Sequence, residues 1–206
     1  MRSLSVGIAL AVVASLVACD SLDRTLPTEE SNVAVPPSLH KHHADRPEHF
    51  RAHLLGANEV PPRTTDARAK LRMRLSRDGL SLNYVLTVSH ISNVTQSHIH
   101  IGAAGVNGGV VVFLFGLVPA GGGPVQGLLA KGTLTGANLI NALAGHPLSD
   151  LIDSIEVGHA YANVHTSDGV DPANTGPGDF PGGEVRAQVE VVGHDHHGHQ
   201  GHGHDD

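Results

Sequence analysis

The sequence predicts an all-β domain built as a Greek-key β-sandwich or barrel. The first observation is residues 67–75, Ala-Arg-Ala-Lys-Leu-Arg-Met-Arg-Leu, in which apolar and basic side chains alternate with the two-residue period of a strand. The second is that further short segments of strand character follow, separated by turns rich in glycine. The third is that residues 138–155 space their apolar side chains by three and four, which indicates one or two short helices in a connection.

The elements are expected in the following order. A first strand covers residues 50–55. Strands at 67–75 and 80–88 flank Arg77-Asp78-Gly79, which is a good turn sequence, and the two strands form a β-hairpin. Residues 116–127, rich in Gly and Pro, form a loop. The remaining strands are expected at 98–101, 109–115, 128–134, 159–166 and 183–192.

Strand parity separates the core from the surface. One face of the hairpin carries apolar side chains and must meet a core, whereas the other carries a basic row and must meet water. The basic row is Arg68, Lys70, Arg72 and Arg74. The predicted core contains Leu71, Met73, Leu75, Leu82, Tyr84, Leu86, Ile99, Val111, Val164 and Val189.

Residues 1–18 are expected to be a lipoprotein signal peptide. Arg2 precedes a short apolar stretch, which is typical of a secretory signal rather than of a membrane-spanning helix. Leu16-Val17-Ala18-Cys19 resembles a bacterial lipobox, in which cleavage precedes the cysteine and diacylglycerol is joined to its thiol. We therefore expect lipidation at Cys19 and anchoring on the extracytoplasmic side of a membrane in the bacterial cell envelope. The alternative is a plain signal peptide with a chance cysteine.

Three segments are expected after the signal peptide. Residues 19–48 are polar and rich in Pro without a strand or helix period, so they form a flexible tether. Residues 49–192 form the domain, and residues 193–206 form a disordered His-rich tail. The tail histidines can bind Cu²⁺, Ni²⁺ or Zn²⁺ without a preformed geometry, and the alternative is a merely soluble tail. These are His194, His196, His197, His199, His202 and His204.

The composition excludes nucleic acid as an expected partner. The formal net charge is −7, so the chain has no basic excess to neutralise phosphates. The sequence contains no Trp, and aromatic residues make up 3% of it, which argues against a stacking platform for bases or sugars.

Two short segments contain the candidate metal ligands. In Ser97–Gly102, Ile99 faces the predicted core, so His98 and His100 point to the opposite face and outward. In residues 159–166 the same parity turns His165 outward. Side chains two apart on a strand start about 6–7 Å apart at Cα, so two imidazoles can reach one ion, and a neighbouring strand can add a third. The alternative is that these histidines are polar residues on an exposed face and bind nothing.

The histidine pattern resembles the copper strand of Cu,Zn superoxide dismutase, where a His-x-His pair also faces away from the barrel core. The resemblance implies that His98, His100 and His165 are copper ligands, and it loosely matches Arg186 to the anion-guiding arginine. The dismutase zinc loop is replaced by a short turn at Gly102–Gly109, so the resemblance implies no zinc site.

A second resemblance covers the whole domain. Four motifs occur in the order typical of the CHRD domain, a module named from chordin and also found in bacterial secreted proteins. It implies a β-sandwich with a dismutase-like or immunoglobulin-like layout. The motifs are FRAHLLGANEVPP, SHIHIGAAGVNGGVVVFL, AYANVHT and PGGEVRAQV.

Two functions remain open from the sequence. The first is a membrane-anchored, non-catalytic binding module that holds a metal ion, copper rather than zinc, through surface histidines and the tail. The second is a copper enzyme of dismutase type.

Glu59 has two possible roles. It either supplies a carboxylate to a site or shapes the turn after the first strand, where Pro61 and Pro62 end strand pairing.

Cys19→Ala tests the lipid anchor. Without the thiol no diacylglycerol can be attached, so the variant should leave the membrane fraction or accumulate unprocessed. Fractionation and the mass of the mature chain report both effects. A variant that matures and fractionates like the wild type would show that the lipobox interpretation is wrong.

Overall fold

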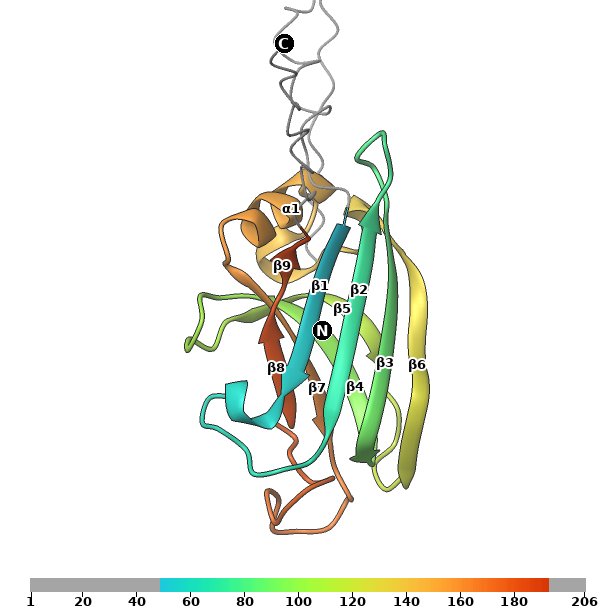
Figure 1. The fold of residues 1–206 in the computed structure, drawn as a ribbon, viewed down its shortest axis with the longest axis vertical. Coiled ribbons are helices and arrows are strands. Elements are labelled where there is room, and N and C mark those ends of the chain that lie inside the picture. Colours follow the sequence, from blue (N-terminus) through green and yellow to red (C-terminus); the bar gives the residue numbers. More distant parts are fainter. Residues whose placement is uncertain (1–48, 193–206) are drawn as a thin grey trace, which may run out of the picture. The chain divides into compact units, whose positions relative to one another are not determined.

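A computed structural model describes residues 49–192 of the chain as an all-β structure with one short α-helix (Figure 1). The predicted signal peptide, tether and tail, with Cys19 and the six tail histidines, lie outside the described residues. The described strands are β1 (His49–Leu55), β2 (Arg68–Leu75), β3 (Leu82–Ser92), β4 (Val94–Ile101), β5 (Gly109–Gly116), β6 (Pro124–Leu134), β7 (Ala160–Thr166), β8 (Val185–Gln188) and β9 (Glu190–Val191).

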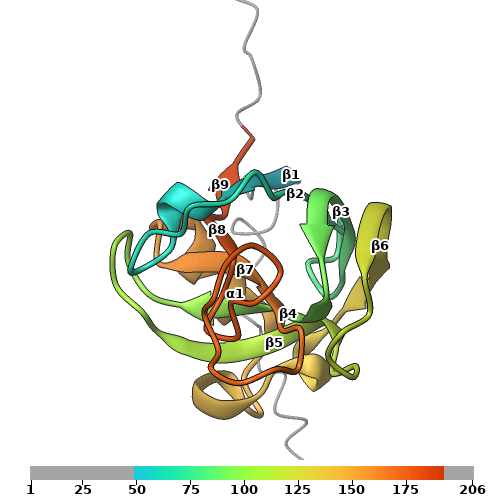
Figure 2. The same ribbon diagram turned by 90° about the horizontal axis from the view of Figure 1, so that it is seen from below.

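The strands form a single antiparallel sheet that curls into a nearly closed barrel (Figure 2). Their order is β5-β4-β7-β8-β1-β2-β3-β6, and β9 pairs with β1. Because β4 pairs with β7 and β8 pairs with β1, strands far apart in sequence become neighbours, as the Greek-key prediction requires. Near the open seam between β5 and β6, the Tyr84 hydroxyl on β3 donates to the Leu114 carbonyl on β5 at 2.7 Å.

The predicted hairpin is confirmed. β2 and β3 pair from Arg68 opposite Ser89 to Leu75 opposite Leu82. Buried and exposed residues alternate along β2, so the basic row lies on the solvent side, as predicted. Leu80, predicted to start the third strand, is 68% exposed instead. The reason is that Ser76 and Ser81 are joined by hydrogen bonds at the end of the hairpin, so Leu80 lies in the turn between them.

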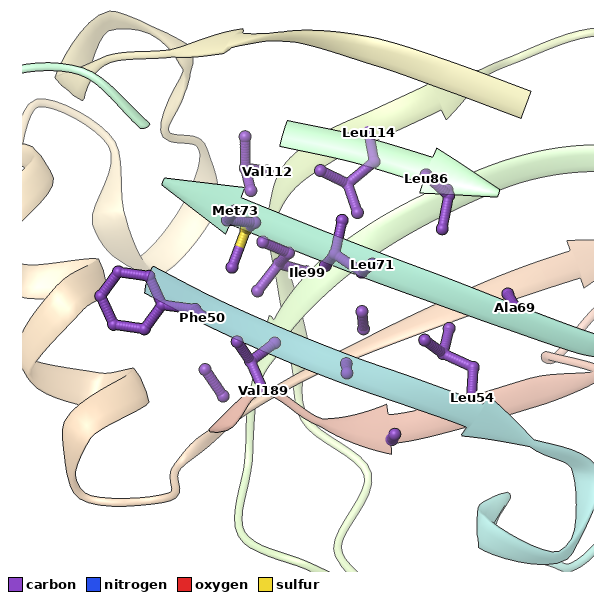
Figure 3. Packing of buried hydrophobic residues seen from close by; sticks show 14 of the residues in the cluster. Phe50, Leu54, Ala69, Leu71, Met73, Leu86, Ile99, Val112, Leu114 and Val189 are labelled. Atoms are coloured by element: carbon purple, nitrogen blue, oxygen red, sulfur yellow. The ribbon is translucent and has the colours of Figure 1, made fainter. Parts of the chain in front are cut away.

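The core prediction is also confirmed, with one partial exception. Nine of the ten predicted residues are buried, and Tyr84 is half-buried because its hydroxyl reaches the barrel seam. Ile99 of β4 is fully buried, and Figure 3 shows it among Leu71, Met73 and Phe50. Core residues from all the long strands belong to one cluster, so the barrel interior is filled.

Other strand limits also differ from the prediction, and β3 continues to Ser92, four residues beyond its predicted end. β4 begins at Val94, four residues before the predicted start. β6 begins at Pro124, inside the predicted loop 116–127. This edge strand is exposed or half-buried at all but its last position, so it lacks the alternation that identifies a strand in a sequence. The predicted last strand is divided at Val189, which is buried and donates its N–H to the Ala160 carbonyl.

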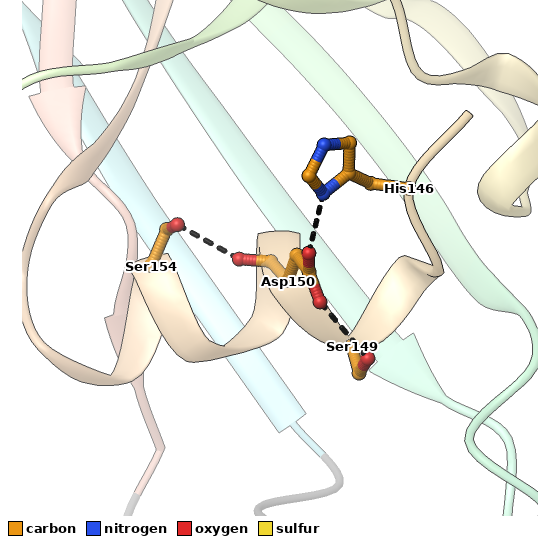
Figure 4. A network of polar contacts seen from close by, with 4 residues as sticks. All are labelled: His146, Ser149, Asp150 and Ser154. Atoms are coloured by element: carbon orange, nitrogen blue, oxygen red, sulfur yellow. Dashed lines mark hydrogen bonds and ion pairs between the residues drawn. The ribbon is translucent and has the colours of Figure 1, made fainter. Parts of the chain in front are cut away.

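The helical connection is confirmed as the short helix α1 (Leu148–Glu156), preceded by two 3-10 turns at Gly136–Asn138 and Asn141–Leu143. α1 buries an apolar face made of Leu148, Leu151, Ile152 and Ile155 against the core. Asp150 in its first turn pairs with His146 at 2.6 Å and accepts from Ser149, while its carbonyl accepts from Ser154 (Figure 4). None of the described helices has the length and apolar character needed to span a bilayer.

Ile99→Ala tests the assignment of the core face. The substitution removes a fully buried side chain from the centre of the barrel, so the free energy of unfolding should fall by about 2–5 kcal/mol. Arg72→Ala, on the exposed side of β2, is the control and should change it by less than about 0.5 kcal/mol. Chemical denaturation measures both, and equal losses would contradict the assignment.

Candidate metal centre

The pairing of β4 with β7 brings the three predicted histidines together. In this ladder His98 lies opposite Asn163, His100 opposite Tyr161 and Gln96 opposite His165. One ring nitrogen from each histidine lies within 4.8 Å of the other two. Among residues 49–192, this is the single group of three or more His, Cys, Asp or Glu side chains that could hold a metal ion.

The histidines are buried, and the prediction that they lie on the molecular surface is wrong. The parity was correct, because Ile99 faces the core and the histidines face the opposite side of the sheet. That side is nevertheless covered, since His98, His100 and His165 are only 3%, 7% and 7% exposed. Every residue of β7 is buried, so this strand has no solvated face at all.

Two connections make polar contacts with the histidines on that side of the sheet. The turn between β4 and β5 places the Gly108 carbonyl 3.0 Å from Nδ1 of His100. The connection between β7 and β8 places the Pro181 carbonyl 2.8 Å from Nδ1 of His165. These contacts link both connections to the cluster.

The same two contacts determine where the ring protons are. A carbonyl oxygen only accepts hydrogen bonds, so Nδ1 of His100 and Nδ1 of His165 must each carry the hydrogen. In the neutral rings the Nε2 atoms then bear lone pairs, and both lie 3.0 Å from the side-chain oxygen of Asn163. Carbonyl contacts of this kind are the usual means of orienting a metal-ligating imidazole.

His98 is the third member of the cluster. Its Nδ1 lies 3.2 Å from Nε2 of His165, whereas its Nε2 is buried without a hydrogen-bond partner. The ring of Phe113 meets the His98 ring edge-on, with centroids 4.4 Å apart. Phe113 itself is 42% exposed, so its ring is in contact with both His98 and solvent.

The buried environment favours the neutral form of all three rings. Burial, together with the adjacent His165 and His100, lowers the pKa of His98 to about 3. Burial also lowers the pKa of His100 and of His165, although their hydrogen bonds to backbone carbonyls act in the opposite direction. Neutral imidazole is the form that binds metal ions.

Arg186 is connected to the cluster by stacking. The His100 ring stacks on the Tyr161 ring with centroids 4.6 Å apart. The Arg186 guanidinium lies 3.4 Å from the centroid of the Tyr161 ring. Arg186 is 2% exposed and donates to the Asn107 side chain and to the carbonyls of Ala103 and Val106. Its donors hold the β4–β5 turn in place, and the anion-guiding role stays a prediction.

A cleft of about 810 Å³ lies beside Arg186, and none of the three histidines lines it. Glu59 contributes a buried carboxylate to this cleft, with Oε1 unpartnered. Burial raises the pKa of Glu59 to about 7, although the charges of Arg186 and Arg63 act to lower it. Gly183 must be glycine here, because a Cβ would lie 2.5 Å from the Glu59 carboxylate and its φ is +124°. The Glu59 carboxylate therefore lies in the cleft, and its use in a binding site stays a prediction.

Three contributors to the site were missed from the sequence. Asn163 and Tyr161 occupy the same parity row as His165, so strand periodicity placed them on the correct face without giving them a role. Phe113 carries no comparable signal, because its contact with His98 depends on register shifts where β5 pairs with β4. A row of polar residues alternating with small apolar ones on a strand was the available clue.

The arrangement fits a transition-metal ion. Three neutral imidazole nitrogens form a donor set for copper or zinc, whose bonds to nitrogen are about 2.0–2.1 Å long. With bonds of that length, an ion bound to His98 Nδ1 and His165 Nε2, which are 3.2 Å apart, has a ligand–metal–ligand angle of about 100–105°. That angle is close to tetrahedral.

Comparisons with known proteins identify one family. The sequence model described as CHRD domain matches residues 50–189, which covers all four motifs quoted above. No significant match was found among curated proteins or among solved structures.

Glu59→Gln tests the buried carboxylate. The pKa of Glu59 is about 7 in the folded protein, against an ordinary value of 4.5. Between these pH values the folded protein keeps Glu59 protonated and the unfolded chain does not, so wild-type stability falls as pH rises through this window. The loss reaches about 3 kcal/mol above pH 7. The variant should match the wild type at pH 4 and be more stable at pH 8 in urea unfolding. Glu156→Gln, on an exposed carboxylate, should change neither value, and identical pH profiles for wild type and Glu59→Gln would contradict the burial of this charge.

Proposed function

This chain belongs to the CHRD domain family, and we propose that its domain is a non-catalytic module that holds one transition-metal ion through His98, His100 and His165. One observation carries the proposal: two backbone carbonyls fix the ring protons of His100 and His165 so that their Nε2 lone pairs converge with Nδ1 of His98. Nitrogens of three neutral imidazoles thus lie close together in a buried space, and a cation is a group that such an arrangement accommodates.

Copper is the proposed metal. Cu²⁺ stands at the top of the affinity order of divalent first-row ions for nitrogen donors, ahead of Zn²⁺. A three-histidine set suits both copper and zinc, so the affinity order makes zinc the second choice. An oxygen-rich set would have favoured calcium or magnesium instead.

Holding the metal is better supported than dismutase chemistry. A catalytic metal keeps a position open to substrate. Here the ligand histidines are buried, Phe113 lies against His98, and the adjacent cleft is not lined by the cluster. Arg186 uses its guanidinium to hold the β4–β5 turn. These features suit retention of an ion more than access for superoxide.

The proposal places the module at a membrane surface in the bacterial cell envelope. Its support is the Leu16–Cys19 motif, which would provide a diacylglycerol anchor ahead of the tether at residues 19–48. In the same proposal the six tail histidines capture metal ions close to the domain. The protein partner follows from no feature of the sequence or the described residues, so the proposal names none.

Copper titration of a chain limited to residues 49–192 tests the site, because the tail would otherwise mask it. This chain should bind one Cu²⁺ at micromolar concentration, and its thermal stability should rise with free metal, by about 2.7 kcal/mol at 100 times Kd. The triple substitution of His98, His100 and His165 by Ala should abolish both effects.

The matched control replaces three exposed histidines, His53, His90 and His159, by Ala. Its copper stoichiometry should equal that of the wild type. Since removal of three buried rings can destabilise the fold, His100→Gln is a milder second variant, and circular dichroism checks that each variant is folded. A wild-type domain that binds no more copper than the triple variant would overturn the proposal.

A further inference from the structure

The hydrogen-bonding roles around Asn163 are inconsistent with a permanent oxygen at the centre of the cluster. Its Oδ1 lies 3.0 Å from Nε2 of His100 and 3.0 Å from Nε2 of His165. Both ring hydrogens are already committed to the carbonyls of Gly108 and Pro181 on the opposite side of each ring. Three acceptor atoms therefore meet with no hydrogen between them.

Two arrangements satisfy these atoms. A cation between them binds all three lone pairs at once. Otherwise the amide must turn by about half a revolution, which exchanges Oδ1 for Nδ2, since the two ends have nearly the same shape. Nδ2 carries two hydrogens and can donate one to each imidazole.

Resting on the proposed function, we propose that Asn163 is the fourth metal ligand and that its side-chain amide has opposite orientations in the two states. With metal bound, Oδ1 of Asn163 coordinates the ion beside the three histidines. Without metal, Nδ2 takes the same position and donates to Nε2 of His100 and Nε2 of His165. The amide thereby serves as a replacement for the ion in the metal-free protein.

The surroundings of Asn163 restrict it to this movement. The residue is 3% exposed and lies on β7, where it pairs with His98 of β4 on one side and with Arg186 of β8 on the other. Ser97 also donates its hydroxyl to the Asn163 carbonyl at 2.6 Å. The backbone is thus fixed, and rotation of the terminal amide is the motion left to the side chain.

The distances suit coordination through Oδ1. With bonds of about 2.0–2.2 Å to nitrogen and oxygen, a separation of 3.0 Å between Oδ1 and each Nε2 gives an angle of roughly 90–95° at the ion. This value lies within the range of a distorted four-coordinate site.

Two substitutions at Asn163 should move metal affinity in opposite directions. Asn163→Asp keeps an oxygen ligand and adds a negative charge, so Zn²⁺ affinity should rise about tenfold or more, while the metal-free protein loses stability because no donor remains between the rings. Asn163→Leu keeps the approximate volume and removes the ligand, so affinity should fall about 10–100-fold. A residue with only a packing role would not give this reversal.

The experiment uses the full chain with Zn²⁺, which is diamagnetic. The same chain with His98, His100 and His165 replaced by Ala measures binding by the tail, and this background is subtracted from every titration. Asn83→Leu, on the exposed side of β3, is the control for the substitution itself and should leave the affinity unchanged.

Side-chain amide resonances in ¹⁵N-labelled protein report the orientation directly. The Asn163 amide is assigned as the signal that Asn163→Leu removes. In the metal-free chain both of its protons should be protected from exchange, and one equivalent of Zn²⁺ above the tail background should abolish that protection.

The outcomes separate this inference from the proposed function. If the triple-histidine variant loses the site but Asn163→Leu keeps wild-type affinity, or if Zn²⁺ leaves the Asn163 amide signals unchanged, the inference is wrong and the three-histidine site stands. If the wild type binds no more Zn²⁺ than the triple variant, the inference is wrong, and if it binds no more Cu²⁺ either, the proposed function is wrong as well.

Discussion

The antiparallel pairing of β4 with β7 is the constraint on which the rest of the site depends. It brings residues separated by more than sixty positions into one ladder, with His98 opposite Asn163 and His100 opposite Tyr161. The same ladder keeps Ile99 and Val164 turned toward the barrel interior, where both are fully buried. Burial of these apolar side chains fixes the register, because a slip by one residue would exchange the core face with the histidine face. The hydrophobic core thus specifies the position of the histidines.

The second requirement is a pair of connections held in place on the histidine side of the sheet. Arg186 holds the β4–β5 turn through Asn107, Ala103 and Val106. Glu184 holds the β7–β8 connection, since its buried carboxylate accepts from the Gly178 N–H and from the hydroxyls of Thr166 and Thr65. The buried polar groups of Arg186 and Glu184 therefore have hydrogen-bond partners, which is the condition for burying them. The carbonyls of Gly108 and Pro181 reach the histidines from these two segments.

Sequence periodicity was sufficient for the barrel and for the face of the sheet on which the histidines lie, because both follow from which side chains share a strand face. The choice of His165 as the third member of the group came from the resemblance to Cu,Zn superoxide dismutase. Periodicity could not give the burial of the histidines. Whether the reverse face of a strand is solvated depends on where distant residues such as Phe113 and Pro181 pack, and no local period encodes that. Asn163 was placed on the correct face but had no assigned role, since its significance arises only from distances to two rings on different strands. The start of the exposed edge strand β6 was missed for a different reason. A strand without a buried face has no alternation of apolar and polar residues to detect.

The burial of the cluster has a thermodynamic consequence. Removing three imidazoles from water is unfavourable unless their polar atoms find partners, and Nε2 of His98 has none. A bound ion would use the lone pairs that otherwise face one another, so metal affinity and fold stability are coupled in this domain. The same burial opposes rapid exchange, because the three imidazoles are at most 7% exposed and an ion can reach them only when neighbouring residues move. A site that is stabilised by its ion and closed over it is suited to long retention, whereas turnover of a substrate would require the opposite balance.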